Sequence, residues 1–323
     1  MKTNLLRLLQ SGEYVSGEDM STALGVSRTA IWKQLNALRE QGYEIQSAPR
    51  KGYKLISAPN TIFPHDVQAF LNTKMLGKQI HYFETVSSTQ PLAHEFAAKN
   101  EKEGMVVLAN QQEGGRGRLG RHWQAKAGDS ISMTLLLRPQ IEIQKAPQLT
   151  LLAAVAVTRA IEKVSGLSCD IKWPNDILFN GKKLVGILTE MAADPDSLKY
   201  VIVGIGINCN QTAQEFGDEL EAVATSIRSE TACPVSRAQL VAEVLNEFEW
   251  LYEQYIEKGF KTIKPLWEAH SISIHTFLSA RMPKKTIYGY AHGITDDGLL
   301  CLEDKNGKEH LIYSADIELD TSP

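Results

Sequence analysis

Residues 114–123 form a segment rich in glycine and arginine, Gly-Gly-Arg-Gly-Arg-Leu-Gly-Arg-His-Trp, between two apolar stretches at 105–112 and 131–138. Glycine allows positive φ angles and a close approach of the backbone to a ligand, and each arginine carries a permanent positive charge. The apolar stretches predict two strands that fix the segment to a core. We therefore expect a loop that wraps an anion, and favour it over a basic surface hairpin or nucleic-acid tail.

The spacing Gly115-x-Gly117-x-x-Gly120 matches the dinucleotide-binding fingerprint, but that motif requires a helix to begin at its end. Residues 122–129 have no helical periodicity, so the fingerprint is incomplete. The Walker phosphate-binding pattern also fails, because Arg121-His122 stands where Lys-Ser or Lys-Thr is required. The segment therefore predicts an anion site of neither kind.

The chain has 323 residues, of which 43% are hydrophobic and 22% are charged, which is typical of two or three soluble domains. Apolar positions near the N-terminus recur at helical spacing with charges between them, so we expect neither a signal peptide nor a membrane span. Four cysteines without a C-x-x-C pair indicate neither a disulfide framework nor a thiolate metal site. A reducing cytoplasm is the expected compartment.

Residues 1–56 contain eight Lys or Arg and five acidic residues, a balance of +3 in a chain whose net charge is −4. The apolar spacing predicts two short helices, a third helix at 28–41 capped by Ser27, and a hairpin with a charged tip at 49–52. This order is typical of a winged helix-turn-helix, which we assign to residues 1–60; a helical module used only for dimerisation is the alternative. The expected DNA contacts are Arg28, Thr29, Lys33, Arg50 and Lys51.

A composition shift at residues 57–60 marks a linker, and strands alternate with helices from there to residue 270. The expected fold class is α/β (α+β), with a central domain at 61–270 built on a mixed sheet. Within it, Asn180-Gly181 predicts a hairpin, and Lys172 lies between apolar neighbours in a short strand. The Lys172 side chain either enters a site or lies along an edge with its charge in solvent.

Ser88 and Thr89 precede Pro91, which is suited to the first turn of a helix. Hydroxyls and free backbone N–H groups therefore converge there. They either hold a polar ligand group or cap the helix, and these residues taken alone favour the cap.

Residues 271–323 carry short alternating runs broken by Asp-Gly and Asn-Gly turns, which predicts a small antiparallel barrel. We assign this domain no chemistry and favour a packing and interaction module.

Five segments, in order, resemble the motifs of a known family: 87–89, 112–121, 172–176, 181–188 and 204–208. They are similar to those of biotin protein ligases. With the winged helix in front, the whole chain resembles the bacterial proteins that serve as both biotin ligase and biotin-operon repressor. One departure is Leu119, where some members have another arginine, so no arginine-type contact is expected there.

The resemblance implies a central ligase domain similar to class II synthetases and a C-terminal SH3-like domain. It also implies that biotin and ATP, with Mg²⁺ on the phosphates, form biotinyl-5'-AMP. A lysine of a biotin carboxyl carrier domain, part of a biotin-dependent carboxylase, would then accept the biotin. The adenylate would also act as co-repressor, favouring a homodimer that binds operator DNA at genes of biotin synthesis and transport.

The same resemblance implies roles for individual residues. Lys172 would act as a point charge between the biotin carboxylate and the α-phosphate, and Arg116 and Arg118 would be planar donors beside it. The biotin-binding residues would be Ser88, Thr89, Gln90, Gln112, Gly115, Arg116, Gly117, Arg118, Lys172, Gly186 and Leu188. The nucleotide-binding residues would be Arg118, Arg121, Trp123, Asn175 and Asn208. No protein ligand to a metal is assigned.

Two functions of other classes stay open. A DNA-binding metabolite sensor that has lost catalysis is opposed by Lys172 and the two loop arginines, Arg116 and Arg118, which such a sensor would not need. A ligase for lipoate is opposed by the N-terminal module, which we would not expect in that class.

Overall fold

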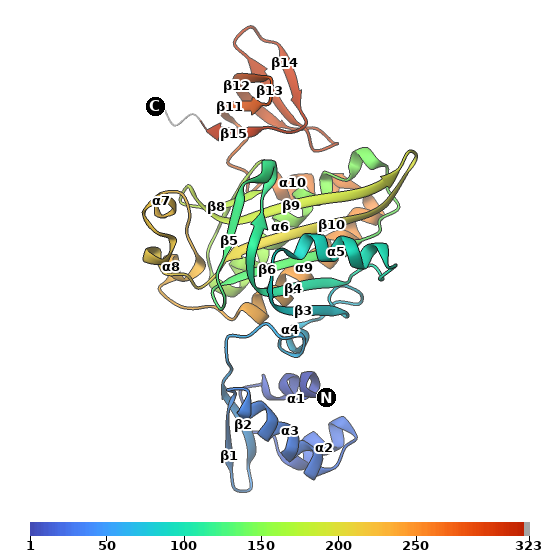
Figure 1. Ribbon diagram of the computed structural model, residues 1–323, viewed down its shortest axis with the longest axis vertical. Helices are drawn as coiled ribbons and strands as arrows, with labels where there is room; N and C mark the ends of the chain where they lie inside the picture. Colours follow the sequence, from blue (N-terminus) through green and yellow to red (C-terminus); the bar gives the residue numbers. More distant parts are fainter. Residues whose placement is uncertain (320–323) are drawn as a thin grey trace.

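The computed structural model describes residues 1–319 and places three bodies along the long axis of the molecule (Figure 1). The N-terminal module lies at one end, the large central domain in the middle and a small β domain at the other end. This mixed architecture agrees with the predicted fold class. Within residues 1–319, no helix is both long enough and apolar enough to cross a membrane.

The N-terminal module is a winged helix-turn-helix, as predicted. Ser16 and Ser27 cap its second and third helices by accepting hydrogen bonds from the backbone N–H groups of Asp19 and Ala30. Buried apolar side chains from all three helices form a core of their own. Its elements are α1 (Lys2–Leu9), α2 (Gly17–Leu24), α3 (Arg28–Glu40), β1 (Glu44–Ala48) and β2 (Gly52–Ser57).

The module rests on α4 (Pro64–Phe70), the first helix of the central domain. Arg7 of α1 donates hydrogen bonds to carbonyl oxygens at the C-terminal end of α4, where a helix leaves acceptors free. The hydroxyl group of Tyr43 in the module donates a hydrogen bond to the buried carboxyl group of Asp66 on α4. Burial raises the pKa of Asp66 to about 7. Polar contacts therefore hold the module against the central domain, together with Ala69 and Phe70 of α4, which pack in and against its apolar core.

A mixed sheet of eight strands forms the centre of the molecule. Seven strands follow the order β3-β4-β6-β10-β9-β8-β7, and β5 pairs with β4 beside them. Among the pairs in the described residues, β3 and β4 are parallel and the others antiparallel. The strands are β3 (Ile80–Val86), β4 (Val106–Arg116), β5 (His122–Ala125), β6 (Ser130–Leu137), β7 (Asp170–Lys172), β8 (Asp176–Phe179), β9 (Lys182–Asp194) and β10 (Ser197–Asn208).

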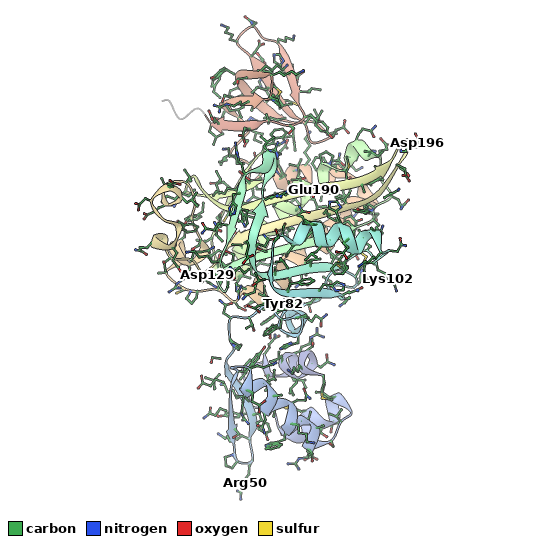
Figure 2. The ribbon with its side chains drawn as sticks, in the orientation of Figure 1. Arg50, Tyr82, Lys102, Asp129, Glu190 and Asp196 are labelled. Atoms are coloured by element: carbon green, nitrogen blue, oxygen red, sulfur yellow. The ribbon has the colours of Figure 1, made fainter. Side chains whose placement is uncertain are left out.

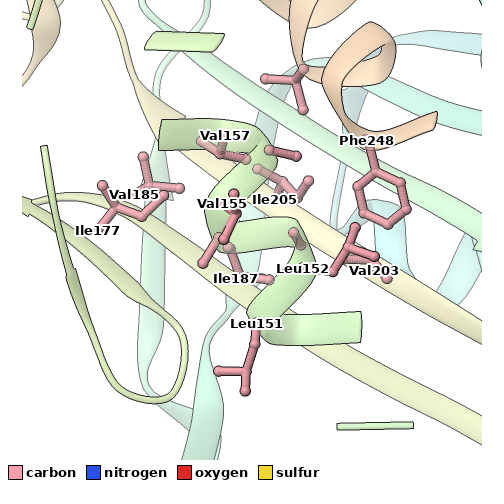
Figure 3. Packing of buried hydrophobic residues seen from close by; sticks show 14 of the residues in the cluster. Leu151, Leu152, Val155, Val157, Ile177, Val185, Ile187, Val203, Ile205 and Phe248 are labelled. Carbon is pink, nitrogen blue, oxygen red and sulfur yellow. The ribbon is translucent and has the colours of Figure 1, made fainter. Parts of the chain in front are cut away.

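Alternating side chains give this sheet two apolar faces. On β6, Leu135 packs into the main core and Leu136 into a separate, smaller cluster on the opposite face. Two long helices, α6 (Gln148–Ser165) and α9 (Arg237–Lys258), supply the main core on the first face (Figure 3). On the second face, α5 (Thr89–Ala98) covers the smaller cluster. Three short helices complete the central domain: α7 (Asp218–Glu221), α8 (Ile227–Thr231) and α10 (Lys264–Glu268).

The C-terminal domain is a sheet of five strands in the order β14-β13-β12-β11-β15. Its antiparallel pairing agrees with the turn pattern, whereas no pair among the described residues closes it into the predicted barrel. A hydrogen bond of 3.3 Å joins it to the central domain, from the indole nitrogen of Trp173 to the carbonyl oxygen of Gly298. The strands are β11 (Thr276–Met282), β12 (Lys285–Ile294), β13 (Leu300–Asp304), β14 (Glu309–Ile312) and β15 (Asp316–Leu319).

Candidate active site and DNA-binding surface

A cavity of about 230 Å³ lies in the central domain beside the N-terminus of α5. Residues of β6, β9 and β10 line it, together with the β4–β5 hairpin and residues 211–224. Asp316 of the C-terminal domain also contributes to the wall. The fold therefore brings together side chains from segments that are far apart in the sequence.

Three glycines on β9 and β10 leave space at the floor of the cavity because they carry no side chain. A Cβ atom at Gly206 would lie 2.5 Å from the ring of Trp123, and one at Gly204 would lie 2.6 Å from the side-chain nitrogen of Gln90. At Gly186 a Cβ atom would lie 3.1 Å from the Trp123 ring. Glycine therefore lets Trp123 and Gln90 lie directly against the sheet.

The N-terminus of α5 supplies the polar groups at one end of the cavity. Gln112 accepts hydrogen bonds at its side-chain oxygen from the backbone N–H and the hydroxyl of Thr89, at 2.8 and 3.0 Å. Gln90 donates its side-chain N–H to the carbonyl oxygen of Leu188 at 2.8 Å, while its own side-chain oxygen is buried without a partner in the described residues. Ser88 caps the helix, so the cap that the sequence favours is present. Gln90 thus lines the cavity beside Ser88 and Thr89 and keeps an acceptor without a partner in the described residues.

The glycine-arginine segment is the tip of a hairpin and not an open loop. β4 continues to Arg116, a short 3₁₀ turn covers Arg118–Gly120, and β5 returns from His122. Gly115 pairs with Trp123 across this hairpin. The alternative of a basic hairpin was therefore correct about its shape, but its arginines also line the cavity.

Arg118 forms hydrogen bonds with residues of both the central and the C-terminal domain. Its guanidinium donates to the side-chain oxygen of Asn175 at 3.0 Å and, in the C-terminal domain, to the hydroxyl of Ser314 at 2.6 Å. Nearby, Arg121 forms an ion pair with Asp316. Burial lowers the pKa of Arg118, which stays charged at neutral pH. The C-terminal domain thus fastens the hairpin over the cavity.

Lys172 is not among the residues that line the cavity, so its expected role stays a prediction. In its place Lys183 lines the cavity, with its ammonium 2.7 Å from Asp176 and 5.8 Å from the centre of the Trp123 ring. A β-bulge between β8 and β9 leaves Leu184 without a register partner. The bulge brings Lys183 to the side of the sheet that Gly186 occupies, although simple alternation places the two on opposite faces.

Gly115 is the second expected ligand residue that the structure does not place on the wall. A Cβ atom there would lie 2.5 Å from the carbonyl oxygen of Trp123, so this glycine serves the close pairing of the hairpin. The expected residues that do line the cavity are Ser88, Thr89, Gln90, Gln112, Arg116, Gly117, Arg118, Arg121, Trp123, Asn175, Gly186, Leu188 and Asn208.

Asn175 and Asn208 are buried and tie the walls together. Asn175 donates to the carbonyl oxygen of Ile187 at 2.9 Å, and Asn208 donates to that of Thr225 at 3.0 Å. Sequence reasoning missed several other wall residues. Asp176 and Lys183 lie in segments that resemble the family but were given no role. No motif marks the chain after β10, which supplies Gln211, Phe216, Leu220, Val223, Ala224 and Asp316.

The expected DNA contacts lie at the end of the molecule that is farthest from the C-terminal domain. Arg28, Thr29 and Lys33 are exposed on the first turns of α3. Arg50 and Lys51 are exposed at the turn between β1 and β2, and Figure 2 shows Arg50 at the extreme end of the molecule. The structure thus leaves all five side chains open to a partner.

Three family models match the three bodies: the HTH domain at residues 2–54, the biotin/lipoate A/B protein ligase family at 82–208 and the biotin protein ligase C-terminal domain at 279–320. The chain is 48% identical to the bifunctional ligase/repressor BirA of Bacillus spizizenii, over 99% of this chain and 98% of that protein. The chain belongs to the bifunctional ligase/repressor family. The resemblance seen in the five motifs is thereby confirmed.

More distant members agree. The BirA ligase/repressor of Escherichia coli is 28% identical over 93% of this chain and 91% of its own length. Among solved structures, the biotin protein ligase of Aquifex aeolicus in complex with biotin and ATP has a TM-score of 0.65 and 28% identity. It covers 76% of this ligase/repressor and 100% of its own chain.

Proposed function

We propose that this ligase/repressor joins biotin to ATP, giving biotinyl-5'-AMP and pyrophosphate, and then transfers biotin to a lysine of biotin carboxyl carrier domains. The observation that carries this proposal is the cavity. Its floor is glycine, the side-chain oxygen of Gln90 is buried without a partner in the described residues, and the cations Arg116, Arg118, Arg121, Lys126 and Lys183 line its wall. A neutral ring system and a polyphosphate require these two environments side by side.

At the α5 end, the biotin head would meet Thr89, Gln90 and Gln112. The unpartnered side-chain oxygen of Gln90 accepts hydrogen bonds, as the N–H groups of a ureido ring require. Ser88, Gly186 and Leu188 complete this end of the wall. Trp123 lies against Gly186 and Gly206 on the floor, with the ammonium of Lys183 5.8 Å from the centre of its ring.

At the cationic end, two anions must approach each other, since the biotin carboxylate attacks the α-phosphate. Two lysines, Lys126 and Lys183, line the wall, and Lys126 donates to the carbonyl oxygen of Glu215. We assign to Lys183 the point-charge role that the sequence suggested for Lys172. Arg116 and Arg118 offer planar donors to phosphate oxygens, and Asn175 and Asn208 would border the adenosine. Mg²⁺ would enter on the ATP phosphates.

The N-terminal module would bind operator DNA through α3 and the β1–β2 turn, with the adenylate as co-repressor. A basic helix start and a basic turn on one exposed end suit phosphates on either side of a major groove. We further propose a homodimer in the adenylate-bound state, which would place two modules on two half-sites of genes for biotin synthesis and transport. The three units would be residues 1–60, 61–270 and 271–323, in a cytoplasmic protein.

Incubation with ATP, a biotin carrier domain and either labelled biotin or labelled lipoate tests the enzymatic part. We expect label on the carrier from biotin alone, with one pyrophosphate released per biotin transferred. Transfer of lipoate would identify a lipoate ligase. Absence of both products in a folded protein that binds DNA would identify a sensor without catalysis.

A further inference from the structure

Trp32 is a large apolar side chain that α3 leaves in solvent. Its exposed fraction is 52%, whereas Ile31, Leu35 and Leu38 on the other side of the same helix are at most 1% exposed. The core of the module is therefore complete without Trp32. An indole held in water on an exposed helix face indicates a contact that the isolated chain does not make.

The neighbours of Trp32 are the expected DNA contacts. Arg28 and Thr29 precede it by four and three positions and so lie beside it on the helix surface, and Lys33 follows it directly. A second exposed tryptophan, Trp250 on α9, differs in this respect. Trp250 is 48% exposed, but the guanidinium of Arg159 covers its ring at 4.9 Å. Among the described residues, no cation and no other aromatic ring covers Trp32 in this way.

The surface around Trp32 is basic, which determines its occupant. Two cations beside it and two more on the β1–β2 turn would attract a polyanion and oppose a second copy of the same positive face. In the major groove of DNA, the apolar group that a side chain meets on the base edges is the C5 methyl of thymine.

We propose that Trp32 packs against a thymine methyl group in the major groove and selects thymine at that position of each half-site. This inference rests on the proposed DNA-binding function. Arg28 and Lys33 would position α3 through phosphates or guanine, while Trp32 would supply sequence preference without any charge. The module would therefore read thymine methyls as well as hydrogen-bonding groups.

The test begins with selection of binding sites from a random-sequence duplex library by the full-length wild type, with biotin and ATP present. Each thymine of the selected site is then replaced by uracil, which removes only the methyl group. At one position per half-site we expect uracil to weaken wild-type binding about fourfold, the value for one buried methyl group. Trp32→Ala should bind the selected site about ten- to a hundredfold more weakly and be indifferent to uracil at that position.

Three matched measurements make the result specific. Trp32→Ala should keep the wild-type affinity for non-specific duplex and the wild-type salt dependence, because the indole touches no phosphate. Trp250→Ala should leave both affinities unchanged. Lys33→Ala should instead reduce the slope of affinity against salt by about one.

The inference is overturned if Trp32→Ala binds the selected site like the wild type, or if it stays sensitive to uracil at the same position. It is also overturned if sedimentation shows that Trp32→Ala fails to dimerise without DNA, since the indole would then contact protein. If the wild type selects no sequence at all, the proposed repressor function fails, and this outcome is distinct from a failure at Trp32 alone.

Discussion

At the scale of single residues, Lys183 and Lys172 form a natural pair for comparison. Both belong to the segments that resemble biotin ligases, yet Lys183 lines the cavity and Lys172 does not. We expect Lys183→Ala to slow adenylate formation by about 10²- to 10³-fold, because the charge that brings the two anions together is lost. Lys172→Ala should stay within a few-fold of the wild type. Pyrophosphate release with biotin and ATP measures both, and the opposite ranking would restore the role to Lys172.

Arg118 is expected to retain the intermediate more than to form it. An acyl adenylate reacts with water or any exposed lysine, so it must stay covered until the carrier arrives. Arg118→Gly removes the bonds to Asn175 and Ser314 that fasten the hairpin. The loss of a charge-assisted hydrogen bond of roughly 1.5 to 3 kcal/mol should speed adenylate escape about ten- to a hundredfold.

The measurement for Arg118 is biotin incorporation into albumin compared with the true carrier. The variant should label albumin in proportion to its exposed lysines. Ser314→Ala, which removes one of these contacts and keeps the guanidinium, should show a smaller change in the same direction. A variant that is slower on both proteins with unchanged selectivity would show that Arg118 serves the chemical step.

The residue scale also shows what the sequence could and could not specify. Gln112 could be assigned to a ligand site because it begins a segment that resembles the family, and Gln90 because it directly follows another. The side of the sheet that Lys183 faces depends on a β-bulge at Leu184, which no local spacing indicates. Gly115 could be recognised as necessary, but only the pairing with Trp123 shows that the hairpin needs it.

At the scale of elements, the contact between the module and α4 should depend on pH. The carboxyl group of Asp66 accepts a hydrogen bond from the Tyr43 hydroxyl group. Burial raises the pKa of Asp66 from 3.8 to about 7. The folded state therefore binds a proton between about pH 4 and pH 7 that the unfolded state has released, so the free energy of unfolding falls as pH rises through this range.

Thermal unfolding of the wild type at pH 5 and pH 8 measures this effect. We expect a lower midpoint at pH 8, and a smaller difference between the two pH values in Asp66→Asn. Asp196→Asn, at the exposed turn between β9 and β10, is the matched control and should retain the wild-type difference (Figure 2). An Asp66→Asn protein with the full wild-type difference would assign the pH dependence to other groups.

The apolar periodicity of the sequence predicted which helices and strands exist, but not which of them contact one another. The three module helices and the β8–β9 hairpin were predicted from apolar spacing, caps and turn residues. The strand β5 was missed because His122–Ala125 is too short and polar to show alternation. Its pairing with β4 is set by tertiary contacts, and it converts the predicted loop into a hairpin.

At the scale of the whole molecule, the sequence indicated three domains, but it did not indicate the contacts between them. The composition shift at 57–60 marked the linker, yet the structure shows that Arg237 of α9, which is buried, donates to the carbonyl oxygen of Asn60 at 2.7 Å. A truncation that removes Asn60 would leave the buried guanidinium of Arg237 without one of its hydrogen-bond acceptors. Only the fold could indicate this, because the two residues are far apart in the chain.

Deletion of residues 1–58 should therefore abolish operator binding and leave biotin transfer close to the wild-type rate. Deletion of residues 1–61 should lower the thermal midpoint further, because Arg237 loses its acceptor at Asn60. Binding of the selected DNA site and carrier labelling measure the first effect, and thermal unfolding measures the second. Loss of carrier labelling in a folded 1–58 deletion would show that the module takes part in catalysis.

Ligation and repression should also share one intermediate, and a single titration tests this most directly. The full-length protein is bound to its selected DNA site with biotin and ATP just sufficient to form one adenylate per chain, and carrier domain is then added. We predict that DNA dissociates in step with carrier labelling, because transfer consumes the adenylate that favours the DNA-bound dimer. A carrier domain with its acceptor lysine changed to arginine should leave the complex intact. Full carrier labelling with undiminished DNA binding would contradict the shared intermediate.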